Sequence, residues 1–205
     1  MVSAPRKQTV ALGISGASGA QYGFRLLQSL IDADQRVYLM ISKAAQVVIG
    51  METDVSLPGR PSDIRKFLLQ RYSAADDQLL VYGENEWTAP IASGRNDADA
   101  MVVCPCSMGA LSAIAQGSSN NLLERAADVT LKERNKLILV PRESPYSVIH
   151  LENMLKLSRM GAVIVDANPG FYNKPESVDD IVDFVVAKIL DQLGVQHALQ
   201  PNWGS

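Results

Sequence analysis

The sequence predicts an α/β fold in which a doubly wound parallel sheet is covered by helices on both faces. Short apolar, β-rich runs alternate along the chain with segments of helical periodicity. The runs are residues 9–15, 37–41, 101–104, 137–140 and 162–165. Because each run is almost continuously apolar, each is expected to be a strand that is buried on both faces, as in a parallel sheet.

The segments between the runs predict helices, because their apolar residues recur every three or four positions. The first such set is Tyr22, Leu26, Leu27, Leu30 and Ile31, and a later set is Val148, Leu151, Met154, Leu155 and Leu157. This alternation of strand and helix is typical of βαβ units. Ligands of such folds bind outside the carboxyl ends of the strands, so functional residues are expected directly after the strands.

The length of 205 residues indicates a single domain spanning residues 1–205. An apolar share of 47% with 20% charged residues is ordinary for a globular protein. The stretch from about 53 to 95 is interrupted by prolines and glycines around an expected helix at 64–72, and we interpret it as an insertion or lid. Residues 195–205 form a C-terminal tail.

Charge and cysteine usage exclude several classes of protein. The net charge is only −3 and the basic residues are scattered, which disfavours nucleic acid as a partner. No apolar run has the length of a membrane span or of a signal peptide's central region. The two cysteines, Cys104 and Cys106, are too close in sequence for a long-range disulfide. A cytoplasmic protein that binds a small molecule fits best.

The first loop, residues 13–19, follows a predicted strand and leads into a helix that starts near Ala20. Its small residues, among them Gly16, Ala17 and Ser18, allow backbone N–H groups and hydroxyls to approach a phosphate at the helix N-terminus. The structural alternative is a tight turn in which Ser18 is the N-cap. The second strand ends in Ser42 and Lys43, where a dinucleotide fold would carry an acid, so a mononucleotide is favoured.

The loop at residues 105–110 again follows a strand and opens a helix. Ser107 and Ala110 provide a hydroxyl and a small side chain beside the first loop, although simple N-capping by Ser107 is an equally good interpretation. Cys104 and Cys106 have no histidine near them in the sequence, so we interpret them as buried structural thiols rather than metal ligands.

Arg142 and Glu143 lie just past another predicted strand. The guanidinium could form a bidentate contact with a phosphate or with the edge of an anionic flavin, and the carboxyl group could transfer a proton. The alternative is a solvated pair of opposite charges.

Four further residues could complete an anion site. Arg125, Lys132 and Lys188 would add positive charge, although each is on a helical stretch where a solvent-facing side chain is the default. Tyr172 follows the last predicted strand and offers a phenol, with a packed aromatic ring as the alternative.

The segment from Asp179 to Asp183 matches the acidic pattern of magnesium-dependent isoprenoid enzymes. We interpret it instead as the first turns of a helix capped by Ser177, where negative charge is favoured by the helix dipole. No metal site is predicted.

Taken in order, these motifs resemble the UbiX flavin prenyltransferase family. The segments that carry the resemblance are residues 13–19, 105–110, 141–143, 150–158 and 170–172. The likeness covers roughly residues 10–194, and the string from His150 to Leu157 adds to its specificity.

The resemblance implies a flavodoxin-like Rossmann fold, a three-layer sandwich. It implies reduced FMN as the substrate to be modified and dimethylallyl monophosphate as the prenyl donor, with no metal. The product would be FMN prenylated at N5 and C6, the cofactor of UbiD-type decarboxylases. It also implies a homo-oligomer, commonly a dodecamer, with sites at subunit junctions.

The resemblance also assigns roles to individual residues. FMN would contact Gly16, Ala17, Ser18, Ser42, Ser107, Ala110 and Arg142. The donor phosphate would be held by Arg125, Lys132, Tyr172 and Lys188, of which Lys132 and Tyr172 are also expected to assist catalysis, and many relatives have arginine in place of Lys188. Glu143 would donate a proton to the phosphate and Ser18 would relay protons near the flavin. Glu52 and Trp87 would line the prenyl pocket. Apart from the resemblance, Trp203 in the C-terminal tail could cover the pocket of a neighbouring subunit, with a disordered tail as the alternative.

Two alternatives remain open. FMN-dependent decarboxylases that process cysteine share the opening loop, but they resemble a Pro-Ala-Ser-Ala-Asn-Thr pattern and use a histidine. This chain has a different sequence at 105–110 and no histidine in its first half. The second alternative is a carrier that delivers FMN without chemistry, against which Glu143 and the lysines of the phosphate site argue.

Overall fold

The computed structural model describes residues 7–200, and its strands form one parallel sheet in the order β3-β2-β1-β4-β5-β6. The strands are β1 (Thr9–Ile14), β2 (Arg36–Ile41), β3 (Leu79–Tyr82), β4 (Ala100–Cys106), β5 (Lys136–Pro141) and β6 (Val163–Ile164). The helices are α1 (Ala20–Asp32), α2 (Lys43–Glu52), α3 (Pro61–Arg71), α4 (Met108–Gln116), α5 (Leu122–Lys132), α6 (Val148–Arg159), α7 (Val178–Leu193) and the short 3-10 helix η1 (Pro90–Ala92).

The five predicted strands are confirmed, and the structure adds β3, which the sequence pattern did not predict. β3 has only four residues and pairs with β2 at the edge of the sheet, where most of its side chains are half-buried. The segment interpreted as an insertion or lid therefore supplies an edge strand as well as helix α3, the helix expected at 64–72. A strand this short carries little pattern of its own.

The strand order has the topology of a flavodoxin-like fold with one extra edge strand. Without β3, the order β2-β1-β4-β5-β6 becomes 2-1-3-4-5 when the strands are renumbered along the chain, which is the flavodoxin order. The winding direction reverses between β1 and β4. A crevice therefore opens at their carboxyl ends, and ligands of this fold class bind there.

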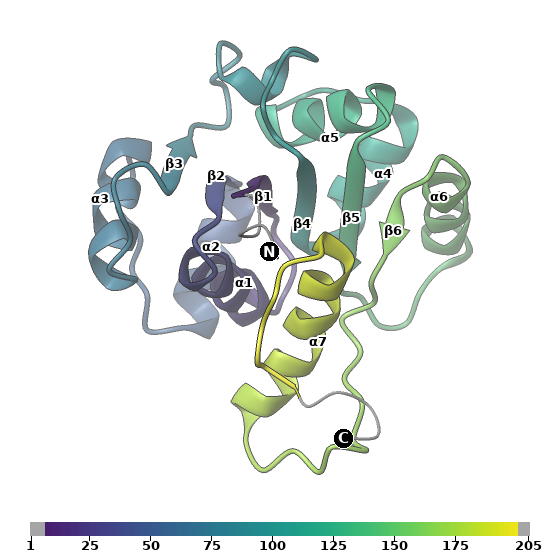
Figure 1. Ribbon diagram of the computed structural model, residues 1–205. Helices are drawn as coiled ribbons and strands as arrows, with labels where there is room; N and C mark the ends of the chain where they lie inside the picture. Colours follow the sequence, from purple (N-terminus) through teal and green to yellow (C-terminus); the bar gives the residue numbers. More distant parts are fainter. Residues whose placement is uncertain (1–6, 201–205) are drawn as a thin grey trace, which may run out of the picture.

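Two apolar layers enclose the sheet, because alternate residues of each strand face opposite sides. On one face Leu12, Leu39 and Ile138 pack with side chains of α1 and α7. On the other face Met101, Val103 and Leu139 pack with side chains of α4, α5 and α6. Figure 1 shows α7 beside α1, with α4 and α5 beyond β4 and β5. This is the predicted three-layer sandwich, and it puts α5 and α7 on opposite faces.

The helix ends confirm two of the predicted caps and correct a third. Ser107 caps α4, and Ser177 caps α7 in a reciprocal arrangement with Asp180. The cap of α1 is Gly19 rather than Ser18, with a left-handed φ of 100° that a glycine adopts without strain. Ser18 is thereby left free for another role.

The two cysteines are buried and unpaired, as expected. Burial raises the pKa of the Cys106 thiol to about 12, so this group is protonated at neutral pH. Within residues 7–200, no helix has both the length and the apolar character needed to cross a membrane.

Helix α1 packs closely on β4 at one glycine. A Cβ atom added to Gly23 would lie 2.6 Å from the carbonyl oxygen of Cys104 and 3.0 Å from Cδ1 of Ile14. Gly50 of α2 offers the opposite case, because a Cβ atom added there would have no neighbouring atom within 4 Å. The first glycine is required by packing, and the second is not.

We therefore expect Gly23→Ala and Gly50→Ala to change stability in opposite directions. Gly23→Ala has to displace α1 from β4 and should lower the free energy of unfolding by about 1–3 kcal/mol. Gly50→Ala removes backbone freedom from the unfolded chain and should raise stability by about 0.5–1 kcal/mol. Urea unfolding of both variants at equal protein concentration measures the difference, and equal midpoints would contradict the close packing at Gly23.

Candidate functional site

Backbone hydrogen bonds join the loops that follow the strands into one continuous edge. The N–H of Ser42 donates to Ile14 O at 3.0 Å, and the N–H of Arg142 donates to Cys106 O at 3.3 Å. The N–H of Ala167 donates to the carbonyl of Pro141, also at 3.3 Å. The first residues after β1, β2, β4, β5 and β6 therefore lie side by side at the carboxyl edge of the sheet.

The buried hydroxyl of Ser15 holds the two loops on either side of the crevice together. Ser15 Oγ donates to Pro105 O at 2.9 Å and accepts the N–H of Ser107 at 2.7 Å. Its own N–H also reaches Pro105 O, at 3.2 Å. The side chain is 4% exposed, so these bonds are shielded from water. The sequence placed Ser15 in the first loop but indicated no role of its own for it, although a polar residue directly after a buried strand is a signal for such a position.

The predicted flavin contacts lie on these loops. Ser42 caps α2 by accepting the N–H of Ala45 at 3.0 Å, and Ser107 caps α4 by accepting the N–H of Ala110 at 3.3 Å. A Cβ atom on Gly16 would approach the Cβ of Ala44 to 2.5 Å, so the first loop can pack on α2 only with glycine there. Loop 15–19, Ser42, the start of α4 and Arg142 are thus brought together, as the sequence predicted.

Glu52, at the end of α2, occupies the N-terminus of α1. Its Oε2 accepts the N–H of Gly19 at 2.8 Å and that of Ala20 at 3.3 Å. Burial by itself raises the pKa of Glu52, but hydrogen bonds from the Ser18 hydroxyl and these two N–H groups, together with the charge of Arg142, outweigh it and lower the pKa. Glu52 is therefore an anion at neutral pH, and it already satisfies the helix end that we expected to meet a phosphate.

Arg142 has an unsatisfied donor in the crevice. Its Nε is buried and has no hydrogen-bond partner within residues 7–200. A buried guanidinium N–H without an acceptor is costly, so an acceptor from outside the chain is expected at this atom. The charge of Arg142, in the loop after β5, also lowers the pKa of Glu52. Because Glu52 accepts the N–H of Gly19, this interaction links Arg142 electrostatically to the loop after β1.

Glu143 is half-buried beside Arg142, and its Oε1 accepts the N–H of Ser144 at 3.1 Å. No ion pair joins Glu143 to Arg142 in the described part of the chain, so the solvated pair considered above is not present there. The structure adds Tyr146, whose hydroxyl donates to Oδ1 of Asp166 at 2.7 Å. Burial, this hydrogen bond, and the charges of Asp166 and Glu143 raise the pKa of Tyr146. The bond links the loops after β5 and β6, and nothing in the sequence pattern indicated it.

Tyr172 and Lys188 both lie near the ring of Phe184. The rings of Tyr172 and Phe184 meet edge to face with centroids 5.4 Å apart, and Lys188 Nζ lies 5.8 Å from the centroid of Phe184. Both predicted side chains are about half exposed. The structure thus brings together two of the four predicted phosphate residues, on the face of the sheet that α7 covers.

The other two, Arg125 and Lys132, are on α5, on the opposite face. Arg125 Nη1 pairs with Asp128 at 2.9 Å, and its Nε donates to Ala92 O at 3.1 Å. Lys132 is the last residue of α5 and pairs with Glu133. Only three residues separate it from the start of β5, so it lies toward the amino edge of the sheet. Within one chain these two cations do not reach the Tyr172 and Lys188 pair.

The three residues predicted to line or cover the prenyl pocket lie in different parts of the chain. Glu52 lies at the crevice as described. Trp87 is 48% exposed in the segment between β3 and η1. That segment contacts the start of α5 through the bond from Leu122 N–H to Glu84 O, 2.8 Å long. Trp203 lies outside the described residues.

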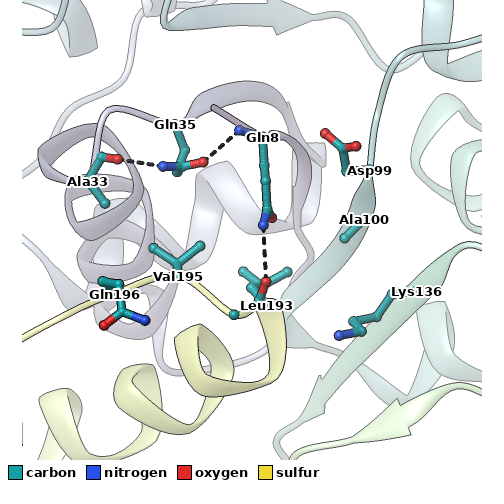
Figure 2. Close-up of a pocket in the computed structure, with 10 residues that line it drawn as sticks. Gln8, Ala33, Gln35, Asp99, Ala100, Lys136, Leu193, Val195 and Gln196 are labelled. Carbon is teal, nitrogen blue, oxygen red and sulfur yellow. Dashed lines mark hydrogen bonds between the residues drawn. The ribbon is translucent and has the colours of Figure 1, made fainter. Parts of the chain in front are cut away.

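A separate cavity of about 490 Å³ lies at the amino edge, far from the crevice loops along the strands. Figure 2 shows the side chain of Gln35 joining Gln8 to Ala33 on its wall, while Gln8 also donates to Leu193 O. Its lining is neutral apart from Asp99 and Lys136. The side-chain amides of Gln8 and Gln35 both donate to backbone carbonyls, so these two groups are already paired within the chain.

Comparisons with known proteins agree with this geometry. Residues 3–190 match the model of the flavoprotein family. The chain is 57% identical to the flavin prenyltransferase UbiX of Pseudomonas aeruginosa, over 99% of this chain and 96% of that protein.

Two solved structures have the same fold over nearly their whole length. AnUbiX (PadA1) in complex with FMN and dimethylallyl pyrophosphate has a TM-score of 0.86 at 39% identity, covering 98% of this chain and 99% of that one. A dodecameric FMN-dependent UbiX-like decarboxylase from Escherichia coli O157:H7 has a TM-score of 0.85 at 44% identity, covering 97% and 100%. The chain belongs to the flavoprotein family and, within it, to the UbiX flavin prenyltransferases.

Proposed function

We propose that this protein transfers a dimethylallyl group from dimethylallyl monophosphate to reduced FMN. The C–O bond of the donor breaks with release of phosphate, and new bonds form to N5 and C6 of the flavin. N5 and C6 each lose a proton, and the prenyl chain gains one at the carbon between its two new bonds. The reaction is thus a group transfer without net oxidation.

The observation that carries the proposal is the buried Nε of Arg142 at the crevice, which has no hydrogen-bond partner among the described residues. A flavin mononucleotide offers acceptors on its phosphate and on its ring edge that could pair with this atom. Ser42 and Ser107 are available at two helix starts beside it, and the glycine at position 16 keeps the first loop close to α2. The residues present therefore fit FMN.

Glu143 is the proposed proton donor to the departing phosphate, since a monophosphate is a poor leaving group while it is fully charged. Ser18 is free of helix capping and hydrogen-bonds to Glu52, so it can relay a proton between that carboxylate and the flavin. Tyr172 and Lys188 hold the donor phosphate from the α7 face by charge-assisted hydrogen bonds, with Arg125 and Lys132 completing the site. Trp87 lines the prenyl pocket.

Completing that site requires more than one chain. Arg125 and Lys132 are on the opposite face of the sheet from Lys188, so a second subunit has to bring its α5 to the first subunit's crevice. The exposed face of α6 supports self-association, because Val148, Leu151 and Leu155 are 69%, 52% and 51% exposed along one side of the helix. The dodecameric relative is consistent with such an assembly. We therefore infer a homo-oligomer, with the dodecamer as the expected form.

The product is a modified flavin that serves as a cofactor, so an enzyme that consumes it is required, and we infer a UbiD-type decarboxylase in that role. The unpaired, buried thiols of Cys104 and Cys106 fit a reducing compartment such as the cytoplasm.

An anaerobic assay with reduced FMN and dimethylallyl monophosphate, followed by mass spectrometry of the flavin, tests the proposal. The expected result is a flavin heavier by one prenyl unit, formed equally well with and without EDTA. An unmodified flavin that stays bound would identify a carrier. Release of CO₂ from a cysteine-containing peptide would identify a decarboxylase.

Replacing Arg142 tests the flavin contact. Arg142→Lys keeps the charge but removes the Nε donor and the planar fork, so the dissociation constant for FMN should rise roughly 10- to 100-fold, as for the loss of a hydrogen bond to a charged group. Arg95→Lys on an exposed loop is the matched control and should bind FMN normally. Fluorescence titration measures both, and normal binding by Arg142→Lys would show that Nε does not contact the flavin.

Replacing Glu143 separates proton transfer from phosphate binding. Glu143→Gln should bind FMN normally while single-turnover prenyl transfer slows roughly 100-fold or more, the usual loss for a positioned general acid, with a smaller change in donor affinity. Lys188→Ala should weaken donor binding as well, because both ground and transition states feel its charge. If Glu143→Gln reacts at the wild-type rate, the acid has to be another group, with Tyr172 next in line.

The apolar face of α6 provides a test of assembly. Combining Leu151→Glu with Leu155→Glu puts two charges on this face, so the particle should become smaller in light scattering after size-exclusion chromatography. Prenyl transfer should fall with it, because the shared sites come apart. The matched control, Leu151→Met with Leu155→Met, conserves volume and apolarity and should assemble fully. Unchanged mass in the double glutamate variant would exclude α6 from the interface.

A further inference from the structure

The chain beyond α7 turns back and follows that helix toward the carboxyl edge. We call residues 195–200 the strap. Val195 is 7% exposed and donates its N–H to Leu190 O at 3.0 Å, and Leu199 packs against the apolar cluster under α7. At its far end Gln200 Oε1 accepts from Nδ2 of Asn173 at 3.2 Å. Figure 1 shows this return path beside α7. The strap therefore ends next to the loop that carries Tyr172.

His197 attaches the middle of the strap to α7. Its side chain is 14% exposed, and Nε2 lies 3.1 Å from Oδ1 of Asp191. Its Nδ1 accepts the N–H of Leu199 at 3.3 Å. Because Nδ1 is an acceptor, the proton of the neutral ring is on Nε2, which donates it to Asp191. One imidazole thus shapes the strap through one nitrogen and holds an aspartate through the other.

Asp191 is shared between His197 and a residue of the proposed donor site. Its Oδ2 lies 4.0 Å from Nζ of Lys188, one helical turn away. Lys188 in turn lies over the ring of Phe184, which the ring of Tyr172 also contacts. A continuous row of contacts leads from the strap to both residues that are proposed to hold phosphate on this face.

We propose that His197 is a positioning residue for the donor phosphate. By holding one oxygen of Asp191, it keeps the other oxygen at the edge of ion-pair distance from Lys188, so the ammonium remains available to an incoming phosphate. Without the imidazole, the half-exposed carboxylate can rotate and pair closely with Lys188, as i and i+3 neighbours on a helix do. The inference rests on the proposed function in one respect, namely that Lys188 binds the donor phosphate.

Three substitutions separate the two nitrogens of His197. His197→Asn keeps an acceptor near the position of Nδ1 and loses the contact with Asp191. His197→Gln keeps a donor near the position of Nε2, and His197→Ala loses both. Gln196→Ala, at an exposed neighbouring position of the strap, is the matched control.

The kinetic expectation is a change in KM for dimethylallyl monophosphate with kcat within about twofold. His197→Ala and His197→Asn should raise this KM roughly three- to tenfold, the effect of one ordinary hydrogen bond. His197→Gln and Gln196→Ala should keep the wild-type value, and all four variants should bind FMN normally. A purely structural role would predict a normal KM for His197→Asn, because that variant keeps the bond to Leu199, and this result would overturn the proposal.

A readout without turnover distinguishes failure of this inference from failure of the proposed function. Reductive methylation of Lys188, followed by peptide mass mapping of the free protein, reports how closely its ammonium is paired. His197→Asn should slow the methylation of Lys188 relative to wild type, and His197→Gln should restore it. An unchanged rate in His197→Asn would refute the positioning role even if prenyl transfer is observed. A slowed rate in a protein that transfers no prenyl group would refute only the proposed function.

Discussion

The hydroxyl of Ser15 lies between the two loops where the sheet changes its winding direction. The crevice there exists because neighbouring crossovers leave toward opposite faces. Ser15, a residue only 4% exposed, bridges its two walls by donating to Pro105 O and accepting from Ser107 N–H. Because water cannot compete for these partners, the starts of α1 and α4 stay in one relative position. The flavin contacts proposed on both loops depend on that spacing.

The charges around the crevice are arranged so that one group is left for a ligand. Glu52 accepts the first N–H groups at the start of α1, and Ser42 and Ser107 each accept one N–H, of α2 and of α4. The buried Nε of Arg142 has no such partner in the described chain. The carboxylate of Glu52 already accepts N–H groups at the start of α1, so Arg142 is the group on this edge that we propose for the flavin.

The distribution of cations over the two faces of the sheet would leave the proposed phosphate site incomplete in a single chain. α5 and α7 cover opposite faces, so Arg125 and Lys188 cannot converge on one phosphate without a second subunit. The same chain leaves an apolar stripe of α6 exposed, which is the surface we propose for self-association. Assembly would bury the stripe and complete the phosphate site together. On the α7 side, His197 of the strap and Lys188 contact the two oxygens of the Asp191 carboxylate, which is why we propose that the strap positions Lys188.

The sequence by itself determined the features that depend on neighbouring residues. Continuous apolar runs identified the buried strands, and polar residues directly after them identified the loops of the site. Serine before a helical segment identified the caps at Ser107 and Ser177. Three features came only from the tertiary structure. Glu52 accepts an N–H at the start of α1 from 33 residues away, and the four-residue strand β3 pairs with β2. The third feature is the division of the cations between the two faces of the sheet. The physical reason is the distance along the chain over which each interaction acts. Capping and helical or strand periodicity involve residues a few positions apart. A long-range contact depends instead on which face of the sheet each crossover takes, and several side chains of suitable chemistry could occupy each such position.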